Sequence, residues 1–294
     1  MKVKLSVATL LLISVIWGFS YFFIQATIDR GISVSFLMSS RFILAALLIL
    51  LVSRGKALKK TNIKNGLMGG LFVFLGFFLQ NTGQKTANIS SVALFTATNV
   101  MMIPLLRWLF YKKRPDLRTL FCCFLGFLGV AVISYQKGQA ISLNAGEMLV
   151  LAGAFFFALH MVFLDSRVRI TDTESFMFWQ MLFAGLYGAV VTVASNEVPS
   201  ISLVKAGLVP VLYVGLLATG FSYLMQAKAQ INVSAALTGM ILSLECIFGA
   251  AFSVLLGYEA FRIQLLIGSL LIMSSIFIME NKIDDVPVKA EKDA

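Results

Sequence analysis

The sequence predicts an all-α integral membrane protein with ten transmembrane helices, arranged as two inverted five-helix repeats. Three observations lead to this fold class. The 294 residues are 59% hydrophobic and only 13% charged, with a mean hydropathy of +0.90, far from the balance of a soluble domain. Lysine and arginine gather in alternate links between the apolar stretches. Short sequence patterns also recur about 140 residues apart.

Ten apolar stretches are each long enough to cross a hydrocarbon core of about 30 Å. A transmembrane β-strand would instead alternate in polarity over roughly ten residues, whereas residues 121–134 are apolar at nearly every position. The first stretch follows Lys2 and Lys4 and continues without a small-residue cleavage site, so we interpret it as an uncleaved spanning helix. We expect helices at residues 5–28, 34–53, 66–84, 90–110, 119–136, 147–165, 174–194, 205–226, 233–257 and 264–280.

Positive charge is unevenly divided between the two sides of the predicted bundle. Of the 24 lysines and arginines, 17 lie on the side of the N-terminus, 5 lie on the other side, and Arg41 and Arg107 fall inside spans. Because basic loops stay in the cytoplasm during insertion, this predicts that both termini are cytoplasmic. The expected location is the plasma (inner) membrane of a bacterial cell. The expected partner of these loops is the lipid bilayer and not a nucleic acid, since they lack interleaved aromatic residues.

The two halves of the chain share short patterns at a nearly constant offset. Ser-Val-Ala-Leu at residues 91–94 and Ser-Ala-Ala-Leu at residues 234–237 open spans 4 and 9, and Gly-Leu pairs at 66–67 and 207–208 open spans 3 and 8. This repetition predicts two units of one evolutionary origin. The predicted units are a first repeat at residues 1–140, a second at residues 141–281, and a disordered cytoplasmic tail at residues 282–294.

Each unit holds five spans, an odd number, so the second unit must enter the membrane from the opposite face. The charges agree, because the link at residues 111–115 is basic and its counterpart at residues 257–261 is nearly neutral. Two inverted copies can exchange conformations, which gives near-equivalent states open to either side of one central site. The organisation therefore predicts a secondary transporter that works by alternating access.

Short motifs in a fixed order also carry a resemblance. Together they resemble the drug/metabolite transporter superfamily, and within it the ten-helix EamA group, over roughly residues 5–280. The resemblance implies export of small metabolites, amino acids or drug-like compounds. The chain departs from the usual family pattern by Cys246 after the acid of span 9, by Lys112 and Lys113 after span 4, and by Pro104 in place of a proline near Val100. The motifs are Trp17-Gly18, Arg41-Phe42, residues 90–98, residues 220–223, Leu244-Glu245 and Gly257-Tyr258-Glu259.

Among the ionisable side chains inside predicted spans, three are considered for a role, because a charge at the bilayer centre costs about 2.5–3.5 kcal/mol. Glu245, in the middle of span 9, is the candidate for substrate binding and for proton coupling, with a neutral, hydrogen-bonded packing role as the alternative. His160 is the single histidine; its titratable ring is a candidate for substrate binding, again with packing as the alternative. Arg41 is interpreted as a structural charge.

Aromatic and amide side chains supply the rest of the candidate pocket. Several of them recur at helical spacing, as on span 1, where every fourth residue from Trp17 is aromatic or polar. Asn99 takes the repeat position of the acid in span 9, so the two are expected to meet at the midplane. Such side chains can line a solute pocket, although helix packing is the alternative for each. The candidates for substrate binding are Trp17, Tyr21, Gln25, Phe95, Asn99 and Gln180.

Two other function classes remain open, a membrane-embedded enzyme and a non-transporting sensor or scaffold. The sequence has no Walker-type loop, no His-Glu-x-x-His motif, and no serine or cysteine at suggestive spacing from its one histidine. We therefore expect no catalytic residue, no cofactor and no metal, and a small molecule as the substrate. The three cysteines, and pairs of small residues four apart, are interpreted as packing within the bundle, which does not define an oligomeric state. The cysteines are Cys122, Cys123 and Cys246.

Overall fold

The computed structural model describes residues 2–112, 114–135, 143–167, 171–233 and 235–280, and these residues form helices and links without a β-strand. The predicted tail at residues 282–294 lies outside this part of the chain. The elements are α1 (Lys2–Asp29), α2 (Val34–Val52), η1 (Lys56–Leu58), η2 (Lys60–Asn62), α3 (Ile63–Gly83), α4 (Ile89–Ala97), α5 (Asn99–Tyr111), α6 (Leu117–Ser134), α7 (Ala145–Arg167), α8 (Thr173–Ala194), α9 (Ile201–Ala206), α10 (Leu208–Leu212), η3 (Tyr213–Phe221), α11 (Ser222–Gln230), α12 (Ala235–Leu255) and α13 (Ile263–Glu280).

These elements make up ten apolar spans. Within the described residues, seven helical stretches are long and apolar enough to cross a membrane, and three shorter apolar helices complete the set. Span 4 consists of α4 and α5, and span 8 consists of α10, η3 and α11. The predicted span positions are confirmed to within a few residues, and so is the all-α membrane fold. Polar side chains accept backbone N–H bonds at the helix starts, among them Ser33, Asp116, Asp172 and Ser200.

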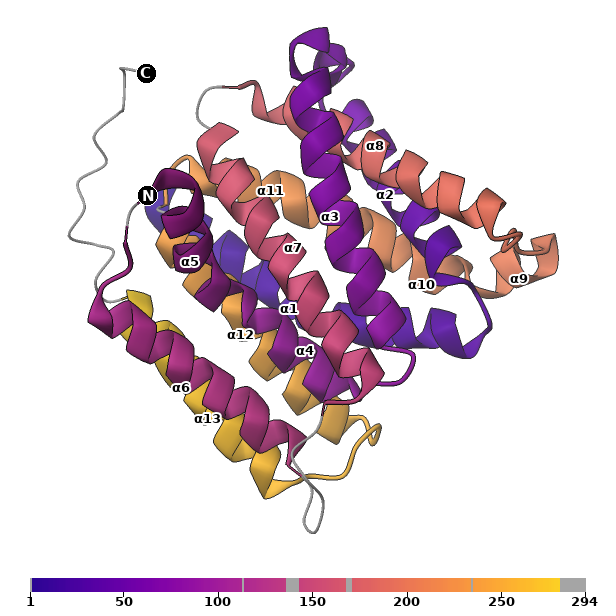
Figure 1. The fold of residues 1–294 in the computed structure, drawn as a ribbon. Helices are drawn as coiled ribbons and strands as arrows, with labels where there is room; N and C mark the ends of the chain where they lie inside the picture. The colour runs from indigo at the N-terminus through magenta and orange to yellow at the C-terminus, as the bar shows by residue number, and fades with distance from the viewer. Residues whose placement is uncertain (1, 113, 136–142, 168–170, 234, 281–294) are drawn as a thin grey trace.

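The helix contacts follow a pseudo-two-fold pattern (Figure 1). Equivalent helices of the two halves lie against each other: α2 against α8, α4 against α12, and α6 against α13 along one edge of the bundle. The other contacts also come in pairs that the repeat relates. In the first half, α3 packs on α7 and α8, and its equivalent, span 8, packs on their equivalents α1 and α2. Similarly, α1 packs on α12 as α7 packs on α4 and α5. This pattern is the one that two inverted copies produce.

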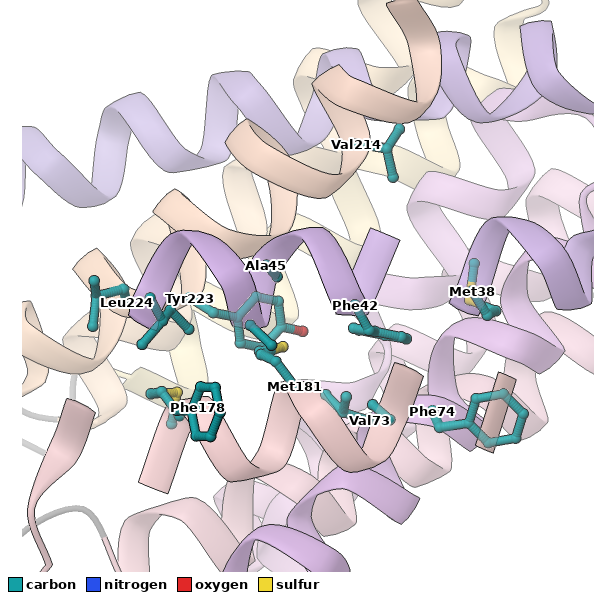
Figure 2. Close-up of a cluster of buried hydrophobic side chains, with 14 of the residues drawn as sticks. Met38, Phe42, Ala45, Val73, Phe74, Phe178, Met181, Val214, Tyr223 and Leu224 are labelled. Carbon is teal, nitrogen blue, oxygen red and sulfur yellow. The ribbon is translucent and has the colours of Figure 1, made fainter. Parts of the chain in front are cut away.

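The largest apolar core lies where α2 crosses α8, with α3 and span 8 on its flanks. Figure 2 shows side chains of this core, including Met38 and Phe42 of α2 and Met181 of α8. Gly188 permits the close approach, because a Cβ at this position would lie 2.6 Å from the backbone nitrogen of Ser39. Small residues at such crossings let membrane helices pack by van der Waals contact, since lipid supplies no hydrophobic drive between them.

Two spans are irregular, whereas span 9 is regular. Span 4 is interrupted at Thr98, and Pro104 lies inside α5, where it removes one backbone hydrogen bond. Span 8 widens into the π-helical segment η3, in which the Thr219 hydroxyl donates to the carbonyl oxygen of Val214, five residues back, at 2.7 Å. Span 9, whose acid is followed by Cys246 and not by proline, is the continuous helix α12.

Links between antiparallel helices lie at two ends of the bundle. We call the end that holds residues 53–62, 114–116 and 228–233 the basic end, after its lysines and arginines. The opposite end holds residues 30–33, 84–88, 195–207 and 256–262. Contacts within each set of links support this division, since Lys59 bonds Asp172 at the basic end and Ser35 bonds Glu197 at the opposite end.

Candidate functional site

A cavity lies in the middle of the bundle, where both halves contribute to its wall. Its volume is about 80 Å³, which is room for a few water molecules or for part of a small solute. Its wall combines aromatic rings, amides, hydroxyls and three ionisable groups. The lining residues are Trp17, Ser20, Tyr21, Arg41, Phe77, Gln80, Thr96, Ala97, Asn99, Val100, Ile103, Phe157, His160, Met161, Tyr223, Gln226, Leu242, Ser243 and Glu245.

The cavity lies at the middle depth of the bundle and is lined from both directions. On α7 and α12 its lining residues lie at the middle of the helix or nearer the basic end, whereas on α1, α2 and α3 they lie in the half nearer the opposite end, for example Gln80. The lining residues nearest the opposite end are Tyr21, Gln80 and Thr96, and the amide of Gln80 donates to the Thr96 hydroxyl at 2.7 Å. We call these three side chains the floor of the cavity.

The π-helical segment η3 anchors two of the lining side chains. The indole Nε1 of Trp17 donates to the carbonyl oxygen of Ala218 at 2.7 Å. The guanidinium of Arg41 donates to the Thr219 hydroxyl through Nε at 3.1 Å and Nη2 at 2.9 Å, and its carbon lies 4.0 Å from the centre of the Phe77 ring. The wide π turn therefore supplies polar groups to α1 and α2 at mid-membrane depth.

Arg41 remains partly unsatisfied in this setting. The side chain is 1% exposed, and its Nη1 has no hydrogen-bond partner. No ion pair joins it to Glu245, the acid of the same cavity. The interpretation of Arg41 as a structural charge therefore covers its bond to Thr219, whereas its place in the cavity wall adds a second possibility, contact with a solute.

Glu245 lies at the middle of α12, where α1 passes close by. Gly18 makes this crossing possible, because a Cβ there would lie 2.6 Å from the Cβ of Phe248 and 3.1 Å from the carbonyl oxygen of Glu245. The Tyr21 hydroxyl lies beside both the Thr96 hydroxyl and the Glu245 carboxyl. Glu245 is partly exposed to the cavity, in contrast to its buried neighbour Cys246. The Glu245 carboxyl therefore lies against Tyr21, a residue of the floor, and faces the cavity on its other side.

The structure brings most of the sequence candidates together. Besides Arg41, five of them line the cavity, and Asn99 and Glu245 share it as the repeat predicted. The other three lie away from it. Gln25 bonds Asp29 near the opposite end, Phe95 is fully buried in the core between α4 and its neighbours, and Gln180 lies behind His160 and bonds its ring at 3.0 Å. The five candidates in the wall are Trp17, Tyr21, Asn99, His160 and Glu245.

Several lining residues are not among the candidates that the sequence predicted. Gln80 and Gln226 carry the signal of a polar group inside an apolar span, which is also the signal of an interhelical hydrogen bond. Phe77, Phe157 and Tyr223 carry no signal, because aromatic residues are common in every span of this chain. What identifies them is their contact with residues of other spans, as when the Tyr223 ring packs 5.4 Å from that of Trp17.

Comparisons with known proteins agree with this architecture. The sequence profile of the EamA-like transporter family matches twice, at residues 4–135 and 144–280. An uncharacterized transporter of Archaeoglobus fulgidus is 26% identical over 274 residues, which are 93% of this chain and 85% of the relative. The uncharacterized transporter YoaV of Bacillus subtilis is 21% identical over 90% of this chain and 93% of its own length. A solved crystal structure, 17% identical, matches with a TM-score of 0.67 over 94% of this chain and 96% of its own.

Proposed function

Because the chain belongs to the EamA-like transporter family, we propose that the central cavity is the solute site of a secondary transporter that exports small molecules by alternating access. The observation that carries this proposal is the cavity itself, which combines Glu245 and Arg41 with aromatic rings from both halves. Ionisable groups at mid-membrane depth are costly and therefore mark solute or ion pathways. Inverted repeats provide the two facing states around such a site.

We take export as the direction of transport from the resemblance to the EamA group, and we combine it with an assigned orientation. The basic end is placed in the cytoplasm, because loops rich in lysine and arginine are retained there. Export then means that the central cavity takes up its solute from the cytoplasm and releases it on the other side. In this proposal the protein lies in the plasma membrane with both termini cytoplasmic.

The lining favours small amphipathic solutes. Trp17, Tyr223 and Phe157 offer aromatic surface, which binds apolar groups and, through the ring faces, cations. Glu245 and Arg41 add one group of each charge, and Asn99 adds an amide that donates and accepts hydrogen bonds. Amino acids, related metabolites and small drug-like compounds carry this combination of groups.

We assign proton coupling to Glu245. A carboxyl at the edge of the cavity can carry one proton, and its neutral form avoids the cost of a charge when the site is closed to water. The site that contains Glu245 would face each side of the membrane in turn. If it binds either a solute or a proton at each turn, the solute flux and the proton flux are coupled. His160 lines the same cavity, but its ring is bonded to Gln180, so we give it a positioning role.

The test combines a binding screen with flux. Purified protein is screened for thermal stabilisation by amino acids, nucleosides, polyamines and cationic dyes, and the hits are tested for flux in proteoliposomes with and without a pH gradient. We expect Glu245→Gln to abolish the effect of the pH gradient, since the amide cannot titrate, and to slow flux about tenfold or more.

The control for that variant is Glu174→Gln. Glu174 pairs with Lys228 at the basic end, with the two side-chain atoms 3.0 Å apart, so this substitution also removes one carboxylate but leaves the cavity intact. Solute flux that is unaffected by Glu245→Gln at every pH would disprove proton coupling at this residue. Absence of flux for every solute that binds would contradict the transporter proposal itself.

A further inference from the structure

The link between α12 and α13 turns back onto the bundle at the opposite end. Gly257 ends α12 in the left-handed conformation, with a φ of 75°, which glycine adopts without strain. The backbone nitrogens of Tyr258 and Glu259 then donate to the carbonyl oxygen of Ser253 at 3.0 and 3.3 Å. This turn brings the Glu259 carboxylate over α12, where the Ser253 hydroxyl donates to its Oε1 at 2.7 Å.

The same carboxylate caps α4, in the other half of the chain. The backbone nitrogen of Ser90 donates to Oε1 of Glu259 at 2.9 Å, and the Ser90 hydroxyl donates to Oε2. Asn88, the residue at the cap position of α4, makes no side-chain capping bond, so Glu259 supplies the acceptor that this helix start lacks. A negative charge at a helix N-terminus also interacts favourably with the helix dipole.

The link also reaches α1, since the Tyr258 ring lies 5.2 Å from that of Phe22. One short segment therefore joins α12, α4 and α1 at the opposite end. Ser90 and Ser253 are both fully buried, so these bonds are shielded from competing water. Next to them along the bundle lie Tyr21, Gln80 and Thr96, the floor of the cavity.

The repeat-related link at the basic end carries the opposite charge. Span 4 ends as span 9 does, with a left-handed residue, since Lys112 has a φ of 57° where Gly257 has 75°. In the counterpart links at residues 111–115 and 257–261, the first carries the basic residues Lys112, Lys113 and Arg114, whereas the second carries Glu259. A guanidinium has no acceptor atom for backbone N–H groups, and its charge is unfavourable beside a helix N-terminus. Arg114 therefore cannot cap the start of α12 as Glu259 caps the start of α4.

We infer that the contact of Glu259 with Ser90 and Ser253 is a latch that holds the opposite end closed, and that Arg114 denies the basic end an equivalent latch. This difference between the two copies favours the state whose cavity faces the basic end. The inference rests on the alternating access proposed above, because it concerns the equilibrium between the two facing states of the transporter. Charge-assisted hydrogen bonds in a shielded place are strong enough to shift such an equilibrium.

The experiment measures which side of the path is accessible to a membrane-impermeant maleimide. It uses full-length protein in proteoliposomes, with the three native cysteines replaced by alanine. Ala93→Cys reports on the closed side, because Ala93 is fully buried on α4 one turn from Ser90. Val100→Cys reports on the cavity, whose wall it joins. Neither reporter requires a known solute.

Glu259→Ala should raise labelling of Ala93→Cys from the opposite side about fivefold or more, and lower labelling of Val100→Cys from the basic side. Glu259→Gln, which keeps an acceptor oxygen but not the charge, should act in the same direction to a smaller extent. Arg114→Glu should also lower labelling of Val100→Cys, since it adds the missing acceptor at the basic end. The control is Glu197→Gln, which removes an acid at the opposite end that bonds Ser35 on α2 at 2.5 Å; it should change neither reporter.

Unchanged labelling of both reporters in Glu259→Ala and Glu259→Gln would overturn the latch. Should one reporter fail to fold, the other still decides the matter, because the two are expected to change in opposite directions. The result is separable from the proposed function. If labelling changes in the Glu259 variants but the protein shows no solute flux, the latch is supported and the transporter proposal is contradicted. If the protein transports solute but labelling does not change, transport is supported and the latch is contradicted.

Discussion

Arg41 shows how a costly charge is accommodated at mid-membrane depth. Its guanidinium depends on the hydroxyl of Thr219 for two of its hydrogen bonds and on the face of the Phe77 ring for a cation–π contact. The Thr219 hydroxyl in turn donates to the carbonyl oxygen of Val214. The charge is thus held by a neutral hydroxyl and a ring, and it stays available to an anionic group that enters the cavity.

At this scale we expect Thr219→Val to destabilise the protein. The substitution keeps the shape of the side chain but leaves Nε and Nη2 of Arg41 without an acceptor, which costs about 2 kcal/mol for a buried charged donor. A lower melting temperature of the purified protein in detergent would record the loss. Thr219→Ser is the matched control, because it retains the hydroxyl, and it should melt close to the original protein. Equal melting of the valine and serine variants would refute the dependence of Arg41 on this bond.

Among the elements, α3 and α8 approach most closely through glycines of α3. A Cβ at Gly66 would lie 2.4 Å from the Cβ of Trp179, and one at Gly70 would lie 2.7 Å from the carbonyl oxygen of Gln180. The start of α8 is fixed as well, since the indole of Trp179 and the hydroxyl of Ser175 both donate to the carbonyl oxygen of Lys59. The Lys59 ammonium bonds Asp172 and lowers the pKa of that carboxyl.

We therefore predict that Gly66→Ala forces α3 and α8 apart. Overpacking of this kind costs about 1–3 kcal/mol, and here the clash involves backbone, which cannot rotate away. The yield of folded protein and its melting temperature should both fall. Met68→Ala, two residues along on the lipid-facing side of α3, is the control and should leave both nearly unchanged. A fully stable Gly66→Ala protein would show that the close approach of the two helices is not required.

The elements also show what the sequence can and cannot reveal. The ten spans were predictable, because a sufficiently long run of apolar residues is stable in a bilayer only as a helix. The π-helical segment at Tyr213–Phe221 was not, because its residues are apolar like those of any span and the wide turn depends on contacts with α2. For the same reason Glu245 and Trp17 could be found as candidates from their chemistry, whereas the placement of Phe95 and Gln180 outside the cavity depends on helix rotation.

For the whole molecule, the organising feature is the inversion of the two halves. The pairings of α2 with α8, α4 with α12 and α6 with α13 relate the halves, and equivalent links consequently lie at different ends. Arg114 belongs to the basic end and Ala260 to the opposite end, although both follow the fourth span of their half. The topology can therefore be tested at two exposed positions.

We expect Arg114→Cys to be labelled only from the cytoplasm and Ala260→Cys only from the outside. The reason is that basic links are retained inside during insertion, whereas the counterpart in the second half is nearly neutral. The measurement is labelling by an impermeant maleimide in intact cells and in inverted vesicles, on a cysteine-free background. Lys60→Cys, at the basic end, is the control for sidedness. Labelling of both test positions from one side would contradict the inverted arrangement.

The different charges of Glu259 and Arg114 bear on how such a protein acquires a direction. When two copies of a duplicated unit are identical, exchanging their conformations changes nothing, so the two facing states have equal free energy. Any preference between the states must then be encoded in positions at which the copies have diverged. A few side chains at the ends of equivalent helices suffice, and the resting side of a pump can be reversed during evolution without altering the pocket that recognises the cargo.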